Sequence, residues 1–139
     1  MTIKEIQEEI IDEFSMFDEW MEKYEYLIEL GKDLPLIAEE HRVDENLIKG
    51  CQSRVWLHAE HEGGKVVFTA DSDAIITKGI ISLLVRVLSG QTPEDIMKAE
   101  MAFVNEIGLT DLLSPTRSNG LVSMVKQMKN YALAFSSQV

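Results

Sequence analysis

The chain has 139 residues, of which 45% are hydrophobic and 27% charged, and its formal net charge is −11. This length and composition predict one globular domain, residues 1–139, with a core of its own. A pI of about 4.6 argues against sequence-independent nucleic-acid binding and against anionic membranes, because both need clustered Lys and Arg. No apolar run approaches the roughly 18 residues of a membrane span, and the acidic start is unlike a signal peptide. With a single cysteine no internal disulfide can form, so we expect a cytoplasmic protein.

Helical spacing of apolar residues dominates the first thirty positions. Thr2 and Glu5 form a capping box that predicts the start of an amphipathic helix. Asp18 resembles the N-cap of a second helix over 19–30, and Gly31 stands where that helix is expected to end. These two segments predict a pair of consecutive helices.

The hydrophobic period changes to two in the middle of the chain. Alternation over 54–61 and again over 65–70 predicts two strands. Gly63 and Gly64 between them predict a tight hairpin turn. A third strand around 46–49 is expected only because two strands rarely form a stable sheet.

Helical spacing returns after the hairpin. Asp71 or Ser72 is the expected cap of a helix that runs through Ser89. A further helix start follows at 92–95, and a turn-forming cluster at 113–120 precedes the last helix. Helices therefore flank one small antiparallel sheet, which is an α+β fold. Four aromatic residues fall on the apolar stripes and are expected in the core: Trp20, Tyr24, Trp56 and Phe68.

Cys51 is the first candidate for chemistry, because it interrupts a polar turn before the first strand rather than an apolar stripe. A lone cysteine is more often a small buried hydrophobe than a nucleophile. Gly50 permits a backbone conformation closed to other residues, and Lys49 and Arg54 supply positive charge that favours the thiolate. The two interpretations stay open, with the reactive thiol favoured.

The three histidines bear on which chemistry this thiol performs. A cysteine hydrolase needs a histidine base beside the thiol, but His58 and His61 point to opposite faces of a strand, so at most one faces Cys51. We expect both to be edge or solvent residues near the hairpin tip. A metal or iron–sulfur site is not expected, since it needs several thiolates or converging imidazoles. A single-thiol carrier and a peroxide-type redox thiol remain.

Two further polar clusters lie in predicted loops. Residues 71–73 fit simple capping of the following helix. Residues 117–120 also precede a helix, but Arg117 is not needed for capping. Its guanidinium is therefore free to hold an anion or a carboxylate of a partner.

Three of these segments together resemble the SufE family, sulfur-acceptor proteins that work with cysteine desulfurases in iron–sulfur cluster assembly. The most specific match is residues 48–56, IKGCQSRVW, around the family's active cysteine. The second is DSDA at 71–74 leading into KGII at 78–81, and the third is LSPTRSNGL at 113–121. The resemblance spans nearly the whole chain and implies a compact α+β fold, similar also to IscU-type scaffold proteins.

The resemblance implies that Cys51 is the sulfur acceptor. Cys51 would take sulfane sulfur as a persulfide from a SufS-like cysteine desulfurase, stimulate that enzyme and pass the sulfur to a SufBCD-type scaffold. Gly50, Gln52 and Ser53 would shape its loop, which should hold Cys51 in an apolar pocket at rest.

Asp73 and Arg117 would then dock the partner or position the loop. The chain itself would bind no metal and no cofactor, since pyridoxal phosphate belongs to the desulfurase. It would be a sulfurtransferase-like partner rather than an independent enzyme. Two alternatives remain: an allosteric activator of the desulfurase that carries no sulfur, and a stand-alone thiol redox enzyme.

Overall fold

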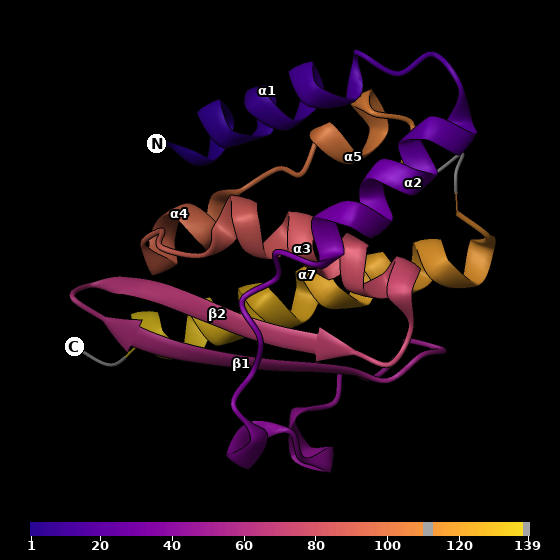
Figure 1. The fold of residues 1–139 in the computed structure, drawn as a ribbon. Coiled ribbons are helices and arrows are strands. Elements are labelled where there is room, and N and C mark those ends of the chain that lie inside the picture. The colour runs from indigo at the N-terminus through magenta and orange to yellow at the C-terminus, as the bar shows by residue number, and fades with distance from the viewer. Residues whose placement is uncertain (110–112, 138–139) are drawn as a thin grey trace.

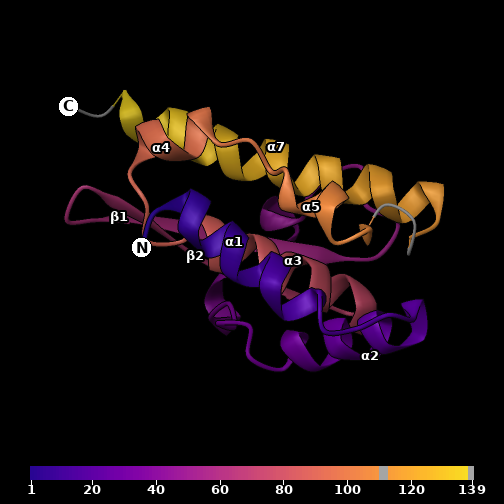
Figure 2. The ribbon, with the colours of Figure 1, turned by 90° about the horizontal axis from the view of Figure 1, so that it is seen from above.

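The computed structural model describes residues 1–109 and 113–137. Its elements, in chain order, are α1 (Ile3–Phe14), α2 (Trp20–Gly31), the 3-10 turns η1 (Glu39–His41) and η2 (Asp44–Asn46), β1 (Val55–Glu62), β2 (Lys65–Ser72), α3 (Ile75–Leu88), α4 (Pro93–Lys98), α5 (Phe103–Glu106) and α7 (Pro115–Ser136). The helices lie on one side of the β-hairpin, and the 3-10 turns lie on the other (Figure 1). Seen from above, α7 and α2 flank α3 on opposite sides (Figure 2). The fold is α+β, as the sequence predicts.

The hairpin follows the predicted pattern closely. β1 and β2 pair antiparallel from Val55 opposite Ser72 to Glu62 opposite Lys65. Gly63 and Gly64 both have positive φ, 57° and 80°, as a tight hairpin turn requires. Six buried residues form the core of the face toward the helices: Val55, Leu57, Ala59, Val66, Phe68 and Ala70.

The predicted third strand around 46–49 is wrong. In the described residues the sheet has two strands, and Leu47 makes only an isolated bridge to Trp56. Ile48 N adds one hydrogen bond to the Val55 oxygen, at 2.8 Å. The hairpin is stable without a third strand because α3 packs against its inner face.

Helix α3 is the centre of the core, and α2 crosses it at a pair of glycines. A Cβ built on Gly79 would collide with the backbone oxygen of Leu27, and one on Gly31 would lie 3.0 Å from Gly79 N. The two backbones therefore approach more closely than any side chain at these positions allows. This contact fixes the first two helices against the layer that carries the hairpin.

Three sequence expectations about helix starts and burial are wrong. Asp18 is not the cap of α2: Glu19 occupies that position and makes no side-chain capping bond. Helix α3 begins after Ala74, because β2 continues through Ser72 and takes Asp71 and Ser72 into the sheet. Trp20 is 61% exposed rather than in the core.

Burial at the other aromatic positions agrees better with the sequence pattern. Phe68 is fully buried and Trp56 is 7% exposed. Tyr24 is partly buried and packs against the core. Within the described residues no helix is long and apolar enough to cross a membrane.

Candidate functional site

Cys51 lies just before β1, half-buried, at the wall of a recess of about 60 Å³. Residues 51–53 form one wall of the recess, Thr77 and Ile80 of α3 form its floor, and the first turns of α7 close it with Arg117 and Gly120. Polar and apolar side chains share the lining, so the recess is not the purely apolar pocket that we expected. Three chain segments far apart in sequence therefore meet at the thiol.

The surroundings of the thiol favour its protonated form. Its Sγ lies 3.6 Å from the backbone oxygen of Gly120, to which the S–H donates a hydrogen bond. Burial raises the pKa of the Cys51 thiol above its ordinary value. The expectation that Lys49 and Arg54 favour the thiolate is wrong for this conformation: both residues are exposed, and burial alone sets the direction of the pKa shift.

Gly50 is required at the entrance of the loop for two reasons. Its φ is +94°, a conformation that other residues rarely adopt. A Cβ at this position would also lie 2.5 Å from Ser123 Oγ on α7. The special backbone expected at Gly50 is thus present, and α7 is the segment that approaches it closely.

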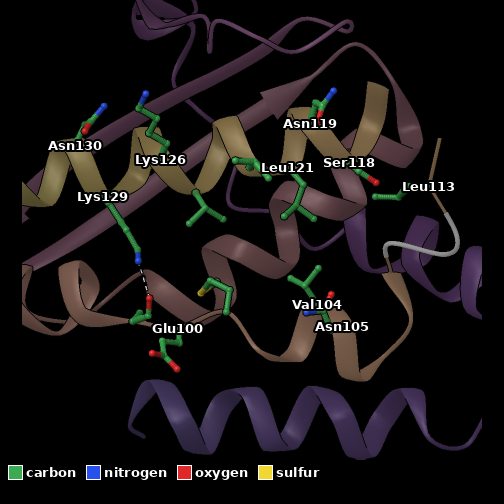
Figure 3. Close-up of a pocket in the computed structure, with 14 residues that line it drawn as sticks. Glu100, Val104, Asn105, Leu113, Ser118, Asn119, Leu121, Lys126, Lys129 and Asn130 are labelled. Carbon is green, nitrogen blue, oxygen red and sulfur yellow. Dashed lines mark hydrogen bonds between the residues drawn. The ribbon is translucent and has the colours of Figure 1, made fainter. Parts of the chain in front are cut away.

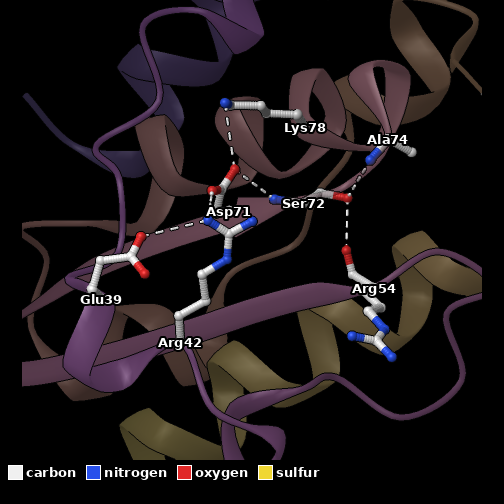
Figure 4. Close-up of polar contacts among 7 residues, drawn as sticks. All are labelled: Glu39, Arg42, Arg54, Asp71, Ser72, Ala74 and Lys78. Atoms are coloured by element: carbon white, nitrogen blue, oxygen red, sulfur yellow. Dashed lines mark hydrogen bonds and ion pairs between the residues drawn. The ribbon is translucent and has the colours of Figure 1, made fainter.

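Asp73 holds the exit of the same loop. Its Oδ1 accepts a hydrogen bond from Arg54 N at 3.1 Å, and its own N donates to the Arg54 oxygen at 3.3 Å. Ser72 Oγ donates to the same oxygen at 2.8 Å and accepts from Ala74 N at 3.2 Å (Figure 4). The segment before α3 therefore fixes the backbone three residues after Cys51.

We call the two hydrogen bonds between Asp73 and Arg54 the Asp73 clamp. Asp71 lies beside it and is a buried carboxylate at the centre of an ion-pair cluster. Its oxygens lie 3.2 Å from Arg42 Nη1 and 3.4 Å from Lys78 Nζ, and Oδ1 also accepts from Ser72 N at 2.8 Å (Figure 4). The cluster joins the chain after η1 to β2 and α3. The sequence indicated only a helix cap here, because no local pattern reveals the distant partners.

Arg117 lines the same recess as the Cys51 thiol. Its backbone N donates to Ser114 Oγ at 3.3 Å, the cap of α7, while its exposed side chain lines the Cys51 recess. In the described residues its guanidinium makes no ion pair. Arg117 adds a cationic residue to the lining of the recess.

The histidines lie away from the thiol, and none lines the recess. His61 is exposed, as expected, and packs beside Phe135 with ring centroids 5.2 Å apart. His58 is not a solvent residue: its ring is stacked under that of His41, with centroids 3.7 Å apart and planes 8° apart. The structure therefore provides no histidine base for Cys51 within the described residues.

A larger groove of about 680 Å³ runs between α7 and the chain around α5 (Figure 3). Val104 and Leu121 line it, and Lys129 Nζ donates to the Ala99 oxygen at 2.6 Å across it. Its lining includes neither Cys51 nor a histidine. The groove is therefore separate from the chemical site, although α7 contributes to both.

Comparison with known proteins identifies the family to which this arrangement belongs. A family model described as SufE, an Fe-S metabolism associated domain, matches residues 8–132. The chain belongs to the SufE family. Cys51, Asp73 and Arg117 all lie within the matched residues, so the site is part of the SufE domain and the protein has a role in Fe–S metabolism.

Curated relatives of this SufE-family chain are similar over most of its length. An uncharacterised SufE-like protein of Rhizobium meliloti is 39% identical over 130 residues, 90% of this chain and 93% of that protein. One from Synechocystis is 36% identical, over 91% of this chain and 79% of the relative. The SufE-like protein 1 of Arabidopsis thaliana, named as chloroplastic/mitochondrial, is 40% identical, and the match covers 34% of it.

A solved structure has the same fold as this SufE-family chain. The solution structure of a hypothetical protein from Thermus thermophilus superposes with a TM-score of 0.77, covering 93% of this chain and 94% of that one. Its sequence identity is 22%, so the likeness concerns the fold alone.

Proposed function

We propose that this SufE-family protein is a sulfur acceptor and carrier for a cysteine desulfurase, with Cys51 as the acceptor thiol. The observation that carries the proposal is the position of this single cysteine: its thiol is half-buried at a recess large enough for one more sulfur atom. About 10–15 Å³ of accessible volume holds a water molecule, and the recess offers about 60 Å³. A sulfane sulfur on Cys51 therefore fits inside it, sheltered from reductant.

The transfer step is a thiol–persulfide exchange. The Cys51 thiolate attacks the outer sulfur of the partner's persulfide, and a bond forms between Cys51 Sγ and that sulfur. The sulfur–sulfur bond within the partner breaks, and the partner's cysteine leaves as a thiolate. The transferred sulfur keeps its proton, so Cys51 becomes a persulfide with no net oxidation or reduction.

The loop must move for this step to occur. At rest the thiol is protonated and bonded to Gly120 O, whereas attack needs a thiolate with open access. Gly50 at the entrance and the Asp73 clamp at the exit bound a segment that swings Cys51 toward the partner. Gln52 and Ser53 shape the loop between these two points, and both line the recess.

Arg117 and the start of α7 support the anionic states of sulfur. The helix begins at Pro115, so the positive end of its dipole lies at the mouth of the recess together with the guanidinium. Both charges favour a thiolate once Cys51 leaves the Gly120 carbonyl. Arg117 also presents a cation to a carboxylate of the partner.

The partner supplies what this chain lacks. Pyridoxal phosphate belongs to a SufS-like desulfurase, and this chain binds no cofactor for the reaction. A SufBCD-type scaffold takes the sulfur afterwards. With a net charge of −11, the protein fits a basic surface on the desulfurase, and these charges act chiefly on the association rate.

Intact mass spectrometry tests the carrier role directly. Wild type and Cys51→Ser are incubated with desulfurase, pyridoxal phosphate and cysteine, without reductant. We expect one or more sulfur atoms on the wild type and none on Cys51→Ser. Stimulated desulfurase turnover with no sulfur on the wild type would overturn the carrier role and leave an allosteric activator. If the wild type gains no sulfur and turnover is not stimulated either, the partnership with the desulfurase is overturned.

A second variant tests the recess. A Cβ at Gly120 would lie 3.5 Å from Cys51 Sγ, an ordinary contact, so Gly120→Ala should fold normally and fill the space for the extra sulfur. We expect its persulfide to form but to be lost to dithiothreitol several-fold faster than that of the wild type. Equal lifetimes would contradict shelter by the recess.

A further inference from the structure

The outer face of β1, away from the helices, carries Trp56, His58 and Glu60 at alternate positions. The segment around η1 lies on this outer side of the hairpin (Figure 1). The Arg42 guanidinium lies 4.4 Å above the Trp56 ring, and the His41 ring is stacked on His58. Two imidazoles and a carboxylate therefore meet on the face opposite α3.

One atom in this cluster lacks a partner. His58 Nε2 is fully shielded from solvent and has no hydrogen-bond partner in the described residues. It lies 3.5 Å from Glu60 Oε1 without making a hydrogen bond to it. A buried polar atom left unpaired costs about 1–3 kcal/mol. Such an atom beside a carboxylate is expected where a ligand completes the site.

We propose that His41, His58 and Glu60 form a binding site for a divalent transition-metal ion of the Zn²⁺ class. One ligand atom from each residue lies within 4.8 Å of the other two. Zinc–ligand bonds of about 2.0–2.2 Å place tetrahedral ligands about 3.3–3.5 Å apart, which the His58–Glu60 pair already satisfies. Two imidazoles and one carboxylate suit zinc rather than Ca²⁺ or Mg²⁺, and water completes the four-coordinate shell.

Binding requires one imidazole to turn. The lone pair of an imidazole nitrogen lies in the plane of its ring, and planes only 8° apart cannot both contain one metal ion. His41 is the ring with more room to rotate, because its side chain is 34% exposed and that of His58 is 22% exposed. Glu40 Oε1, 3.8 Å from His41 Nε2, adds negative charge that favours a cation there.

The ion would connect η1 to β1 and so fix the outer segment to the sheet. This segment also carries Arg42, which pairs with Asp71, so the metal would reinforce an existing contact. Since the unfolded chain does not hold the three ligands together, binding stabilises the folded state. The site involves neither Cys51 nor its recess and does not depend on the proposed sulfur transfer.

Zinc titration of the tag-free, full-length Cys51→Ser protein tests the site, because this background removes the thiol as a competing ligand. Calorimetry should show one saturable Zn²⁺ per chain, and the melting temperature should rise when Zn²⁺ is added. We expect His41→Ala and Glu60→Gln each to weaken binding at least about 10-fold. His61→Ala is the matched control, because His61 lies on the same strand but points to the other face, and it should bind as tightly as the parent.

Cobalt gives a second readout of the ligand set. Co²⁺ at the site should give the d–d absorption of a four- or five-coordinate ion, lost in His41→Ala and kept in His61→Ala. No saturable binding in the parent, or equal binding in the parent and the His41→Ala and Glu60→Gln variants, would overturn the proposal. His58→Ala is informative only if circular dichroism shows it folded, so the first two variants decide.

Discussion

The thiol of Cys51 is hydrogen-bonded to the backbone oxygen of Gly120, which lies 69 positions further along the chain, with Sγ and O 3.6 Å apart. The bond joins the loop before β1 to the second turn of α7. It fixes the thiol as a donor, so the proton must leave before the sulfur can act as a nucleophile. The sulfur transfer proposed above therefore requires the loop to release this bond.

The first prediction concerns pH. Because burial raises the pKa of Cys51, the rate of alkylation by iodoacetamide should reach its midpoint at a higher pH in the folded protein than in urea. At neutral pH the unfolded chain should react faster, since more of it is thiolate. Coincident profiles for the folded and unfolded chains would contradict this.

The same pKa shift contributes to stability with a defined sign. The folded state keeps the thiol protonated, so above the pKa of the unfolded thiol the unfolded chain binds fewer protons and the free energy of unfolding falls. Below that pKa the contribution is fully present. Tyr26, whose pKa is raised to about 12, also acts at alkaline pH, so the difference between wild type and Cys51→Ser isolates the thiol.

The second prediction concerns Gly50. Gly50→Ala should lower the free energy of unfolding by about 1–3 kcal/mol, because a non-glycine residue is strained at its positive φ, and its Cβ meets Ser123 Oγ. Combining it with Ser123→Ala should recover only the steric part. Urea denaturation of both single variants and the double variant measures this coupling. A Gly50→Ala protein as stable as the wild type would show that the backbone at position 50 does not require glycine.

The third prediction concerns the Asp73 clamp. Asp73→Ala removes the acceptor for Arg54 N, which should increase the alkylation rate of Cys51 several-fold and cost about 0.5–1.5 kcal/mol of stability. Asp73→Asn keeps one oxygen acceptor and should have a smaller effect. If Asp73→Ala changes sulfur transfer but not alkylation, the residue acts on the partner rather than on the loop.

The fourth prediction concerns Arg117. Its side chain is exposed, so Arg117→Ala should change the free energy of unfolding by less than about 0.5 kcal/mol. Sulfur transfer from the desulfurase should nevertheless slow several-fold, with partial recovery in Arg117→Lys. Lys126→Ala is the matched control, because Lys126 is a cation on the same helix that lies in the groove and not at the recess. Equal sulfur-transfer rates for both alanine variants would show that Arg117 has no specific role at the site.

Local patterns predicted most of the secondary structure. The capping box at Thr2, the glycine pair of the hairpin and the alternation in β1 each depend on neighbours a few residues away, and all three are confirmed. The boundary between β2 and α3 was misplaced, because acids and serine before a helix fit a cap as well as they fit a strand end. Pairing of Ser72 with Val55 decided between the two.

The sequence by itself determined the α+β class and the reason for a glycine at position 50, and it singled out Cys51 as the candidate thiol, since these follow from periodicity, backbone sterics and motif. Tertiary structure decided everything that depends on distant partners. It buried Cys51 beside α7, which raises the pKa of the thiol. It also placed Asp73 where its carboxylate accepts a hydrogen bond from Arg54 N, and it stacked His41 on His58. Sequence spacing carries no information on such contacts, because they arise only when separate elements pack together.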